Sequence, residues 1–247
     1  MRLWPKKMMR QREQSDMQDV VSKLYQENKH LLLKNIDELI DLHDNEGHPL
    51  LQHQGDQNEG STGKVDCFFL YLLVLHFKPK IILEAGTYVG TTAKFMAHAA
   101  KEYGGVVHTC DPRDFFVPNN KYDNLFFHNA MSTAVLDDFF EEGVQVDMAF
   151  YDSPSQSLAR ELSGEHTAPL KKVISENFIF AAHDYYGGNG ETKKGHTAVA
   201  AAQHLFNHDK HDLFVPPFET YNSGHKIPDL DFGINGCTTC ILPKDFC

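Results

Sequence analysis

The stretch Lys80-Ile81-Ile82-Leu83-Glu84-Ala85-Gly86-Thr87-Tyr88-Val89-Gly90-Thr91-Thr92 decides how this chain folds. Its first half is a short apolar run, which is typical of a strand buried on both faces of a parallel sheet. The two glycines allow a sharp turn and a close approach of the backbone to a ligand or a helix. The helix-prone residues that follow would present free N–H groups at their start. This order predicts a cofactor-binding turn at the carboxyl edge of an α/β sheet.

The spacing of the glycines separates two classes of cofactor. A nicotinamide site has the pattern G-x-G-x-x-G, whose helix N–H groups hold a pyrophosphate. Here the pattern is Glu84-x-Gly86-x-x-x-Gly90, and Tyr88 stands where the middle glycine would be. A carboxylate at Glu84 repels a diphosphate and suits a cationic ligand. The turn resembles motif I of class I S-adenosylmethionine-dependent methyltransferases, in the E-x-G-T-x-x-G-x-[ST] form of catechol-type and related small-molecule O-methyltransferases.

The rest of the chain alternates between strands and helices, as a doubly wound sheet does. The final segments, 213–215 and 231–242, are typical of a strand pair and not of another strand–helix unit. With the resemblance, the pattern predicts an α/β fold: a Rossmann-like, doubly wound, mostly parallel seven-stranded sheet with an antiparallel C-terminal strand, plus N-terminal helices. After residues 80–85, the expected strands are 105–110, 125–128, 146–151 and 178–182.

Two units are expected. Residues 1–61 form an N-terminal helical extension and lid loop, because apolar residues recur at helical spacing over 15–43 and a polar, glycine-rich segment follows. Residues 62–247 form the S-adenosylmethionine-binding methyltransferase domain, which opens with an apolar, buried helix over 65–77. The N-terminal helices could join two chains as a homodimer or cap the site, and the sequence does not decide between these roles.

Composition excludes several classes of partner. The formal net charge of −11 argues against nucleic acid, because binding phosphates requires clustered Lys and Arg. No apolar run approaches the roughly 20 residues that span a bilayer, so no membrane partner is expected. The N-terminus lacks the apolar core of a signal peptide, which makes the cytoplasm the expected location. The class of partner that remains is a small-molecule substrate.

Four predicted strands each end in an acidic residue: Glu84, Asp111, Asp152 and Asp184. The carboxyl ends of parallel strands lie along one edge, so the four carboxylates should line a single cleft. Acidic residues are also common as turn formers and helix caps, which makes any one of them weak support. Four in succession after a glycine-rich turn favour a binding site.

The resemblance gives these residues roles. Glu84 and the glycine turn would hold the methionine end of the cofactor, and Asp111 would accept hydrogen bonds from the ribose hydroxyls. Met131 and Ser132 stand where the family binds adenine, although core packing explains Met131 equally well. The cofactor-binding residues implied in this way are Glu84, Gly86, Thr87, Tyr88, Gly90, Thr91, Asp111, Met131, Ser132 and Asp152.

Asp152 and Asp184 match positions that hold Mg²⁺ in the catechol-type branch, and carboxylate oxygens suit that ion. The chain departs from that branch twice: Tyr185 replaces an expected Asn ligand, and Ser155 replaces an expected catalytic Lys. The His183-Asp184 pair is more similar to natural-product and sugar methyltransferases, whose metal use varies. The resemblance therefore leaves the use of Mg²⁺ open.

His183 and Asp152 are the catalytic candidates. An imidazole can accept a hydroxyl proton near neutral pH, which makes His183 a candidate general base. A buried histidine bonded to backbone at a strand end is the competing interpretation. His196 is a second candidate for the base, in a glycine-rich loop.

The five cysteines have the pattern of reduced thiols in an apolar core. Cys237 and Cys240 have a spacing found in metal and redox sites, but residues three apart in a strand point to opposite faces. One metal could not use both without a turn, so neither role is expected here.

The favoured function is methyl transfer from S-adenosylmethionine to a small-molecule hydroxyl, carried out by an O-methyltransferase. Two other classes stay open: a methyltransferase-like protein that binds a nucleoside or the cofactor without turnover, and an NAD-dependent oxidoreductase. The missing middle glycine and the strand pair at the C-terminus argue against the oxidoreductase.

Overall fold

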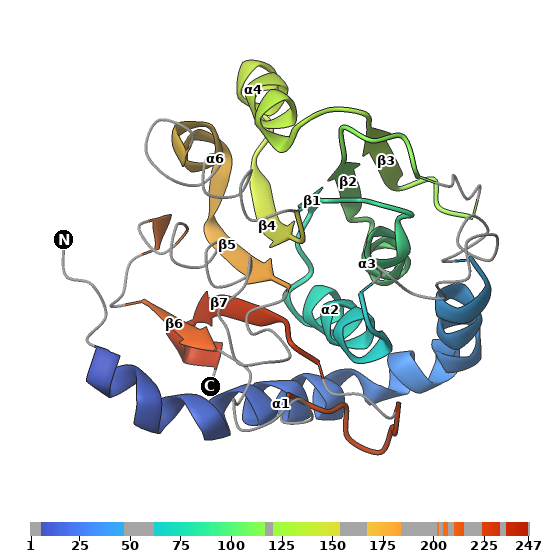
Figure 1. The fold of residues 1–247 in the computed structure, drawn as a ribbon, viewed down its shortest axis with the longest axis vertical. Helices are drawn as coiled ribbons and strands as arrows, with labels where there is room; N and C mark the ends of the chain where they lie inside the picture. Colours follow the sequence, from blue (N-terminus) through green and yellow to red (C-terminus); the bar gives the residue numbers. More distant parts are fainter. Residues whose placement is uncertain are drawn as a thin grey trace.

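The computed structural model describes residues 6–46, 62–116, 121–153, 167–183, 202, 205–206, 210–214, 224–232 and 236–246. A seven-stranded sheet in the order β3-β2-β1-β4-β5-β7-β6 runs through the centre of these residues (Figure 1). The strands are β1 Ile81–Ala85, β2 Val106–Cys110, β3 Leu125–His128, β4 Val146–Tyr151, β5 Ile174–Ala182, β6 His211–Phe214 and β7 Thr239–Pro243.

The first five strands are parallel, and β7 is antiparallel to both β5 and β6. The predicted fold class is confirmed, including the antiparallel strand near the C-terminus. The strand order reverses at β1, because the chain continues to β2 on one side of β1 and later to β4 on the other. A reversal of this kind opens a crevice at the carboxyl ends of β1 and β4, where ligands bind in open α/β sheets.

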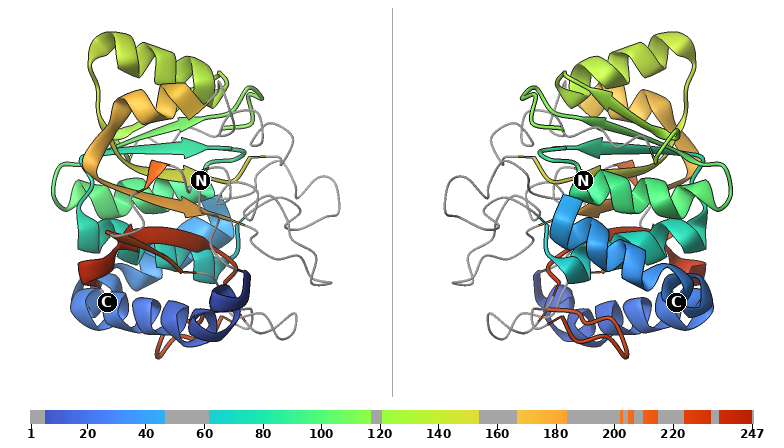
Figure 2. Two further views of the ribbon diagram at one scale, coloured as in Figure 1. Left: turned by 90° about the vertical axis from the view of Figure 1, so that its left-hand side faces the viewer. Right: turned by 90° about the vertical axis from the view of Figure 1, so that its right-hand side faces the viewer.

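Helices cover both faces of the sheet (Figures 1 and 2). On one face lie α2 (Lys64–Phe77) and α3 (Thr91–Lys101), with α1 (Lys6–Asp41) outside them, and α1 ends in a π-helical turn (Leu42–Glu46). On the other face lie α4 (Ser132–Glu142) and α6 (Thr167–Val173), and a short 3-10 turn, Lys244–Phe246, follows β7.

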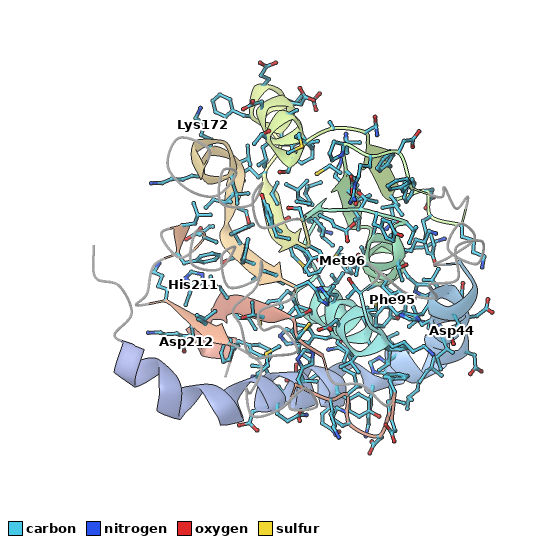
Figure 3. All side chains as sticks on the ribbon, in the orientation of Figure 1. Asp44, Phe95, Met96, Lys172, His211 and Asp212 are labelled. Atoms are coloured by element: carbon cyan, nitrogen blue, oxygen red, sulfur yellow. The ribbon has the colours of Figure 1, made fainter. Side chains whose placement is uncertain are left out.

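Alternate residues of each strand contribute to the two faces of the core, as the twofold period of a strand requires. Ile82 is buried against the cluster that includes α1, α2 and α3, whereas Leu83 and Ala85 are buried against α4 and α6. Phe95 and Met96 of α3, labelled in Figure 3, belong to the first cluster. The central strands are therefore buried on both sides, which explains their continuous apolar sequences.

The predicted apolar helix over 65–77 is confirmed as α2, and it is buried from Val65 to Leu75. It is apolar on all sides because α1 covers the side that faces away from the sheet, through Met17, Val20 and Leu24. A single helix, α1, covers residues 15–41, where the apolar spacing predicted one or two helices. No helix within the described ranges combines the length and hydrophobicity that a bilayer span requires.

The structure differs from the prediction around β5. The strand begins at Ile174 instead of residue 178, and α6, which precedes it directly, was not predicted. The first part of the strand extends beyond the buried core and carries polar residues, Ser175, Glu176 and Asn177. It therefore lacks the apolar pattern by which a buried strand is recognised. Residues 197–206, whose sequence is typical of a further helix, lie mostly outside the described residues.

Candidate functional site

The turn after β1 brings two strand ends into direct contact. Gly86 has φ +102°, and a Cβ atom there would lie 2.6 Å from the backbone oxygen of Asp152. The backbone N–H of Asp152 donates to the carbonyl of Ala85 at 2.8 Å. Gly90 has φ +84° and starts α3 against the ring of Phe116. Both glycines have left-handed conformations that side chains disfavour, as the spacing predicted.

Four predicted site residues line one cavity of about 250 Å³ at the carboxyl ends of β1 and β2: Gly86, Asp111, Met131 and Ser132. Arg113 also lines this cavity. Met131 is 39% exposed, so core packing, the alternative interpretation of this residue, is wrong. These four residues follow three different strands, β1, β2 and β3, and the fold brings them together around one cavity.

Asp111 is the buried anion of this cavity. Its carboxylate accepts hydrogen bonds from the backbone N–H groups of Tyr88 at 3.2 Å and Arg113 at 2.9 Å. The Arg113 guanidinium also donates, from Nε at 3.1 Å. Burial raises the pKa of Asp111, but these hydrogen bonds outweigh burial and hold the pKa below its ordinary value. The residue is therefore ionised at neutral pH.

Glu84 lies on the α3 side of the sheet and is not among the residues that line the cavity. It is completely buried, and its two oxygens accept hydrogen bonds from the hydroxyls of Thr92 and Thr109. Burial raises its pKa to about 8, so the carboxyl is largely protonated at neutral pH. This differs from the prediction of a negatively charged rim residue. Asp111 and Asp152 follow the last residue of their strands, whereas Glu84 is inside β1 and points into the core.

The variant Glu84→Gln should change how stability depends on pH. A carboxyl whose pKa rises from 4.5 to about 8 on folding stabilises the fold below the lower value, and this contribution is lost as the pH rises through the upper value. Relative to Glu84→Gln, the wild-type free energy of unfolding should therefore fall between about pH 5 and about pH 9. Urea denaturation across this range measures the difference.

Glu102→Gln, an exposed change at the end of α3, is the matched control and should follow the wild type across the range. A constant difference between wild type and Glu84→Gln at all pH values would contradict the burial of an uncharged Glu84.

A second group of polar residues lies where β4 and β5 end. Asp152 accepts a hydrogen bond from the Thr62 hydroxyl at 2.9 Å, and its Oδ1 lies 3.4 Å from Nδ1 of His183. The other ring nitrogen of His183, Nε2, lies 3.4 Å from Oδ2 of Asp66 and 3.4 Å from Sγ of Cys237. The two predicted catalytic residues are therefore adjacent. Asp184, Tyr185, Ser155 and His196 lie outside the described residues.

Asp66 and Cys237 were not predicted as site residues. Asp66 is in the first turn of α2, and its carboxylate accepts hydrogen bonds from the backbone N–H groups of Cys237 at 3.0 Å and Thr238 at 2.7 Å. These bonds hold the segment before β7 against the start of α2. A lone acidic residue in an otherwise apolar, buried helix is the signal that could have identified Asp66. For Cys237 the sequence gives only its spacing from Cys240.

The charges of this group depend on one another. Burial alone lowers the pKa of His183, but the charges of Asp152 and Cys237, together with the hydrogen bonds of Asp152 and Asp66, outweigh it and hold the pKa well above its ordinary value. Burial raises the pKa of Asp66, but the hydrogen bond and charge of His183 hold it well below the ordinary range. His183 thus lies between two carboxylates that favour its protonated form. Its predicted role as general base requires the neutral ring.

Comparisons with known proteins identify the fold. No protein-family model matches this chain, and no curated protein sequence matches it. The O-methyltransferase of Bacillus cereus, solved in complex with S-adenosylhomocysteine, is 13% identical, with a TM-score of 0.52 over 92% of this chain and 100% of that chain. The O-methyltransferase TomG of Streptomyces achromogenes, solved with S-adenosylmethionine, is 12% identical, with a TM-score of 0.54 over 92% of this chain and 98% of that chain.

A methyltransferase of Podospora anserina, bound to S-adenosylhomocysteine, is 15% identical, with a TM-score of 0.54 over 85% of this chain and 88% of that chain. The similarity extends over nearly the whole length of these proteins. This chain therefore has the fold of class I O-methyltransferases, as the resemblance of its turn sequence predicted.

Proposed function

We propose that this protein transfers a methyl group from S-adenosylmethionine to a hydroxyl of a small-molecule acceptor. The observation that supports this most directly is the cavity at the carboxyl ends of β1 and β2, where Gly86, Asp111, Met131 and Ser132 converge. The titratable residues Asp152 and His183 lie next to it, at the ends of β4 and β5. Similar folds hold S-adenosylmethionine or S-adenosylhomocysteine, which supports the same ligand here.

Asp111 would bind the ribose. Its ionised carboxylate can accept hydrogen bonds from both hydroxyls of a ribose diol, which is the strongest pairing that the cavity offers. The Arg113 guanidinium, whose side chain is 53% exposed, now binds one side of the Asp111 carboxylate. Because the Asp111 carboxylate is itself buried, the ribose hydroxyls would have to replace the hydrogen bonds of the guanidinium as it turns out to solvent.

Met131 and Ser132 would hold the adenine. Met131 stands immediately before α4 with its thioether half-exposed at the cavity, and a polarisable sulfur packs well on an aromatic ring. Ser132 begins α4, where the hydroxyl can bond the edge of a base. Gly86, at the other end of the cavity, lets the β1 turn lie against the backbone of Asp152, where any side chain would clash.

The sulfonium of the cofactor would supply a methyl group already activated for displacement. The chain itself would bind both reactants, align them and exclude water. Asp152 is suited to position the acceptor, because its backbone contacts the β1 turn while its side chain faces His183. Whether Mg²⁺ takes part through Asp152 and Asp184 remains an expectation from the resemblance.

The two other classes of function make different demands. A binding protein without turnover needs the cavity but not a buried ionic group beside it. An NAD-dependent oxidoreductase needs a close approach of a diphosphate to the turn, where Tyr88 stands in place of glycine.

A cytoplasmic location and a homodimer through the N-terminal helices also belong to this proposal, although the apolar side of α1 already packs against the rest of the chain.

Methyl transfer can be tested with methyl-labelled S-adenosylmethionine and a panel of catechols, phenols and sugars. Labelled product is expected with at least one hydroxylated acceptor. Asp152→Asn should lower turnover on the order of 100-fold through misplacement of the acceptor. Asp137→Asn, the same change at an exposed position of α4, is the matched control and should keep wild-type turnover. Cofactor binding without labelled product from any acceptor would favour the binding protein.

A further inference from the structure

Three different metal-binding atoms converge within 4.8 Å of one another, close to the end of β5. Oδ2 of Asp66, Nε2 of His183 and Sγ of Cys237 come from the start of α2, the end of β5 and the segment before β7. The separations are 3.4 Å from oxygen to nitrogen, 3.4 Å from nitrogen to sulfur and 3.8 Å from sulfur to oxygen. Segments that are far apart in the sequence thus place one oxygen, one nitrogen and one sulfur around a common point.

These separations match the edges of a tetrahedral zinc site. With Zn–O and Zn–N distances of about 2.0–2.1 Å and a Zn–S distance of about 2.3 Å, ligand atoms lie roughly 3.3–3.6 Å apart. The triangle formed by Asp66, His183 and Cys237 has edges close to this range. A zinc ion could therefore bind with only small movements of the side chains.

The surroundings of His183 fit the same interpretation. Histidines that bind metals almost always pair their second ring nitrogen with a carboxylate or a carbonyl, which fixes the ring. Nδ1 of His183 lies 3.4 Å from Asp152, and Asp152 is held in turn by Thr62. The ring thus has a carboxylate behind it and the Asp66 oxygen and the Cys237 sulfur in front of it.

We propose that Asp66, His183 and Cys237 bind a zinc-class divalent cation, with a fourth coordination position that is open as far as the described residues extend. Three protein ligands and one open position are typical of catalytic zinc sites, whereas structural sites use four protein ligands. Cys237 is only partly buried, which leaves access from solvent. The proposed site is distinct from the oxygen-only Mg²⁺ site that the resemblance suggests, because it uses an imidazole and a thiolate.

The cluster could instead be an ion pair with a thiol packed beside it. The Asp66 carboxylate, however, already accepts hydrogen bonds from the backbone N–H groups of Cys237 and Thr238. The ion pair therefore does not require the Cys237 thiol as a further donor. Mg²⁺ prefers six oxygen ligands, whereas imidazole and thiolate suit zinc and its neighbours. The donor set therefore favours a zinc-class cation over Mg²⁺.

A use for the open position rests on the proposed methyl transfer. A cation at this point would lower the pKa of an acceptor hydroxyl bound to it, so that the hydroxyl proton could pass to water. The resulting alkoxide would take the methyl group from the sulfonium, and S-adenosylhomocysteine would leave. Binding of the cation itself does not depend on that reaction, and it can be measured without cofactor or acceptor.

Cobalt substitution tests the site directly. The full-length protein is freed of metal with a chelator and titrated with Co²⁺ without oxygen. One equivalent should give the intense visible bands of tetrahedral cobalt and a thiolate-to-cobalt charge-transfer band, and Zn²⁺ should abolish both while Mg²⁺ should not. Cys237→Ser should remove the charge-transfer band. Cys240→Ala, a buried thiol three residues away, should keep it.

Asp152→Asn removes the carboxylate behind His183 but none of the three ligands. It should weaken cobalt binding roughly 10–100-fold and leave the charge-transfer band in place. If Cys237→Ser does not fold, alkylation of Cys237 in the wild type replaces it: Zn²⁺ should slow the reaction and Mg²⁺ should not. Cobalt bound without a thiolate band, a band that persists in Cys237→Ser, or no protection by Zn²⁺ would overturn the proposal. Failure to bind S-adenosylhomocysteine would not.

Discussion

Replacing Asp111 with alanine is expected to weaken the binding of S-adenosylhomocysteine by about 100-fold or more. A hydrogen bond to a charged group contributes about 1.5–3 kcal/mol, and two such bonds to the ribose would be lost. Each 1.4 kcal/mol corresponds to about a tenfold change in the dissociation constant. Isothermal titration calorimetry of wild type and variant measures the change.

Asp114→Ala is the matched control for this prediction. Asp114 lies three residues after Asp111 on the same loop and is exposed, so its loss should leave the affinity unchanged. Loss of Asp111 also frees Arg113, which then has no carboxylate partner in the cavity. Equal affinities for wild type and Asp111→Ala would show that the ribose does not bind at this carboxylate.

Replacing Gly86 with alanine is expected to lower the free energy of unfolding by about 3 kcal/mol or more. Positive φ costs a non-glycine residue about 1–3 kcal/mol, and overpacking adds about 1–3 kcal/mol. The added methyl would lie 2.6 Å from the oxygen and 2.7 Å from the carbon of the Asp152 carbonyl, both backbone atoms that cannot rotate away. Thermal unfolding should show a decrease in Tm of about 6–12 °C.

Gly104→Ala separates the two contributions. Gly104 also has a positive φ, +78°, but a methyl group there would meet no atom within 4 Å. Its cost should therefore be the smaller, conformational part alone. If Gly86→Ala and Gly104→Ala unfold at the same temperature, the close contact between the β1 turn and the end of β4 is not a feature of the folded protein.

The sheet could be predicted from the sequence because its central strands are buried on both faces. Burial on both faces requires continuous apolar residues, and these are easily recognised in β1 and β4. The predicted bounds of β4 match the structure. The polar start of β5 lies beyond the buried core and lacks such a pattern. The helix α6, only seven residues long, offers too little periodicity to recognise.

The site could be predicted only in part. Residues that follow a strand directly, such as Asp111 and Asp152, are placed by the sheet, so their positions at its carboxyl edge follow from the strand pattern. Glu84 is two register positions earlier, inside β1, where Thr92 of α3 and Thr109 of β2 enclose its carboxyl group. Two positions along a strand thus separate a carboxylate at the sheet edge from a carboxyl group buried in the core.

The cluster of Asp66, His183 and Cys237 could not be predicted from spacing. Its members come from three segments that approach one another because β7 pairs with β5 and the segment before β7 is hydrogen-bonded to the start of α2. Contacts between distant segments leave no local pattern in a sequence. The spacing of Cys237 and Cys240 drew attention to a pair of thiols, whereas the fold pairs Cys237 with His183.

The most direct test of this account is calorimetry of the unmodified protein with S-adenosylhomocysteine and, separately, with NAD⁺. If the hollow between Gly86, Asp111 and Met131 holds a sulfur nucleoside, S-adenosylhomocysteine should bind with one site per chain and NAD⁺ should give no heat of binding. Binding of NAD⁺ without binding of S-adenosylhomocysteine would contradict the account.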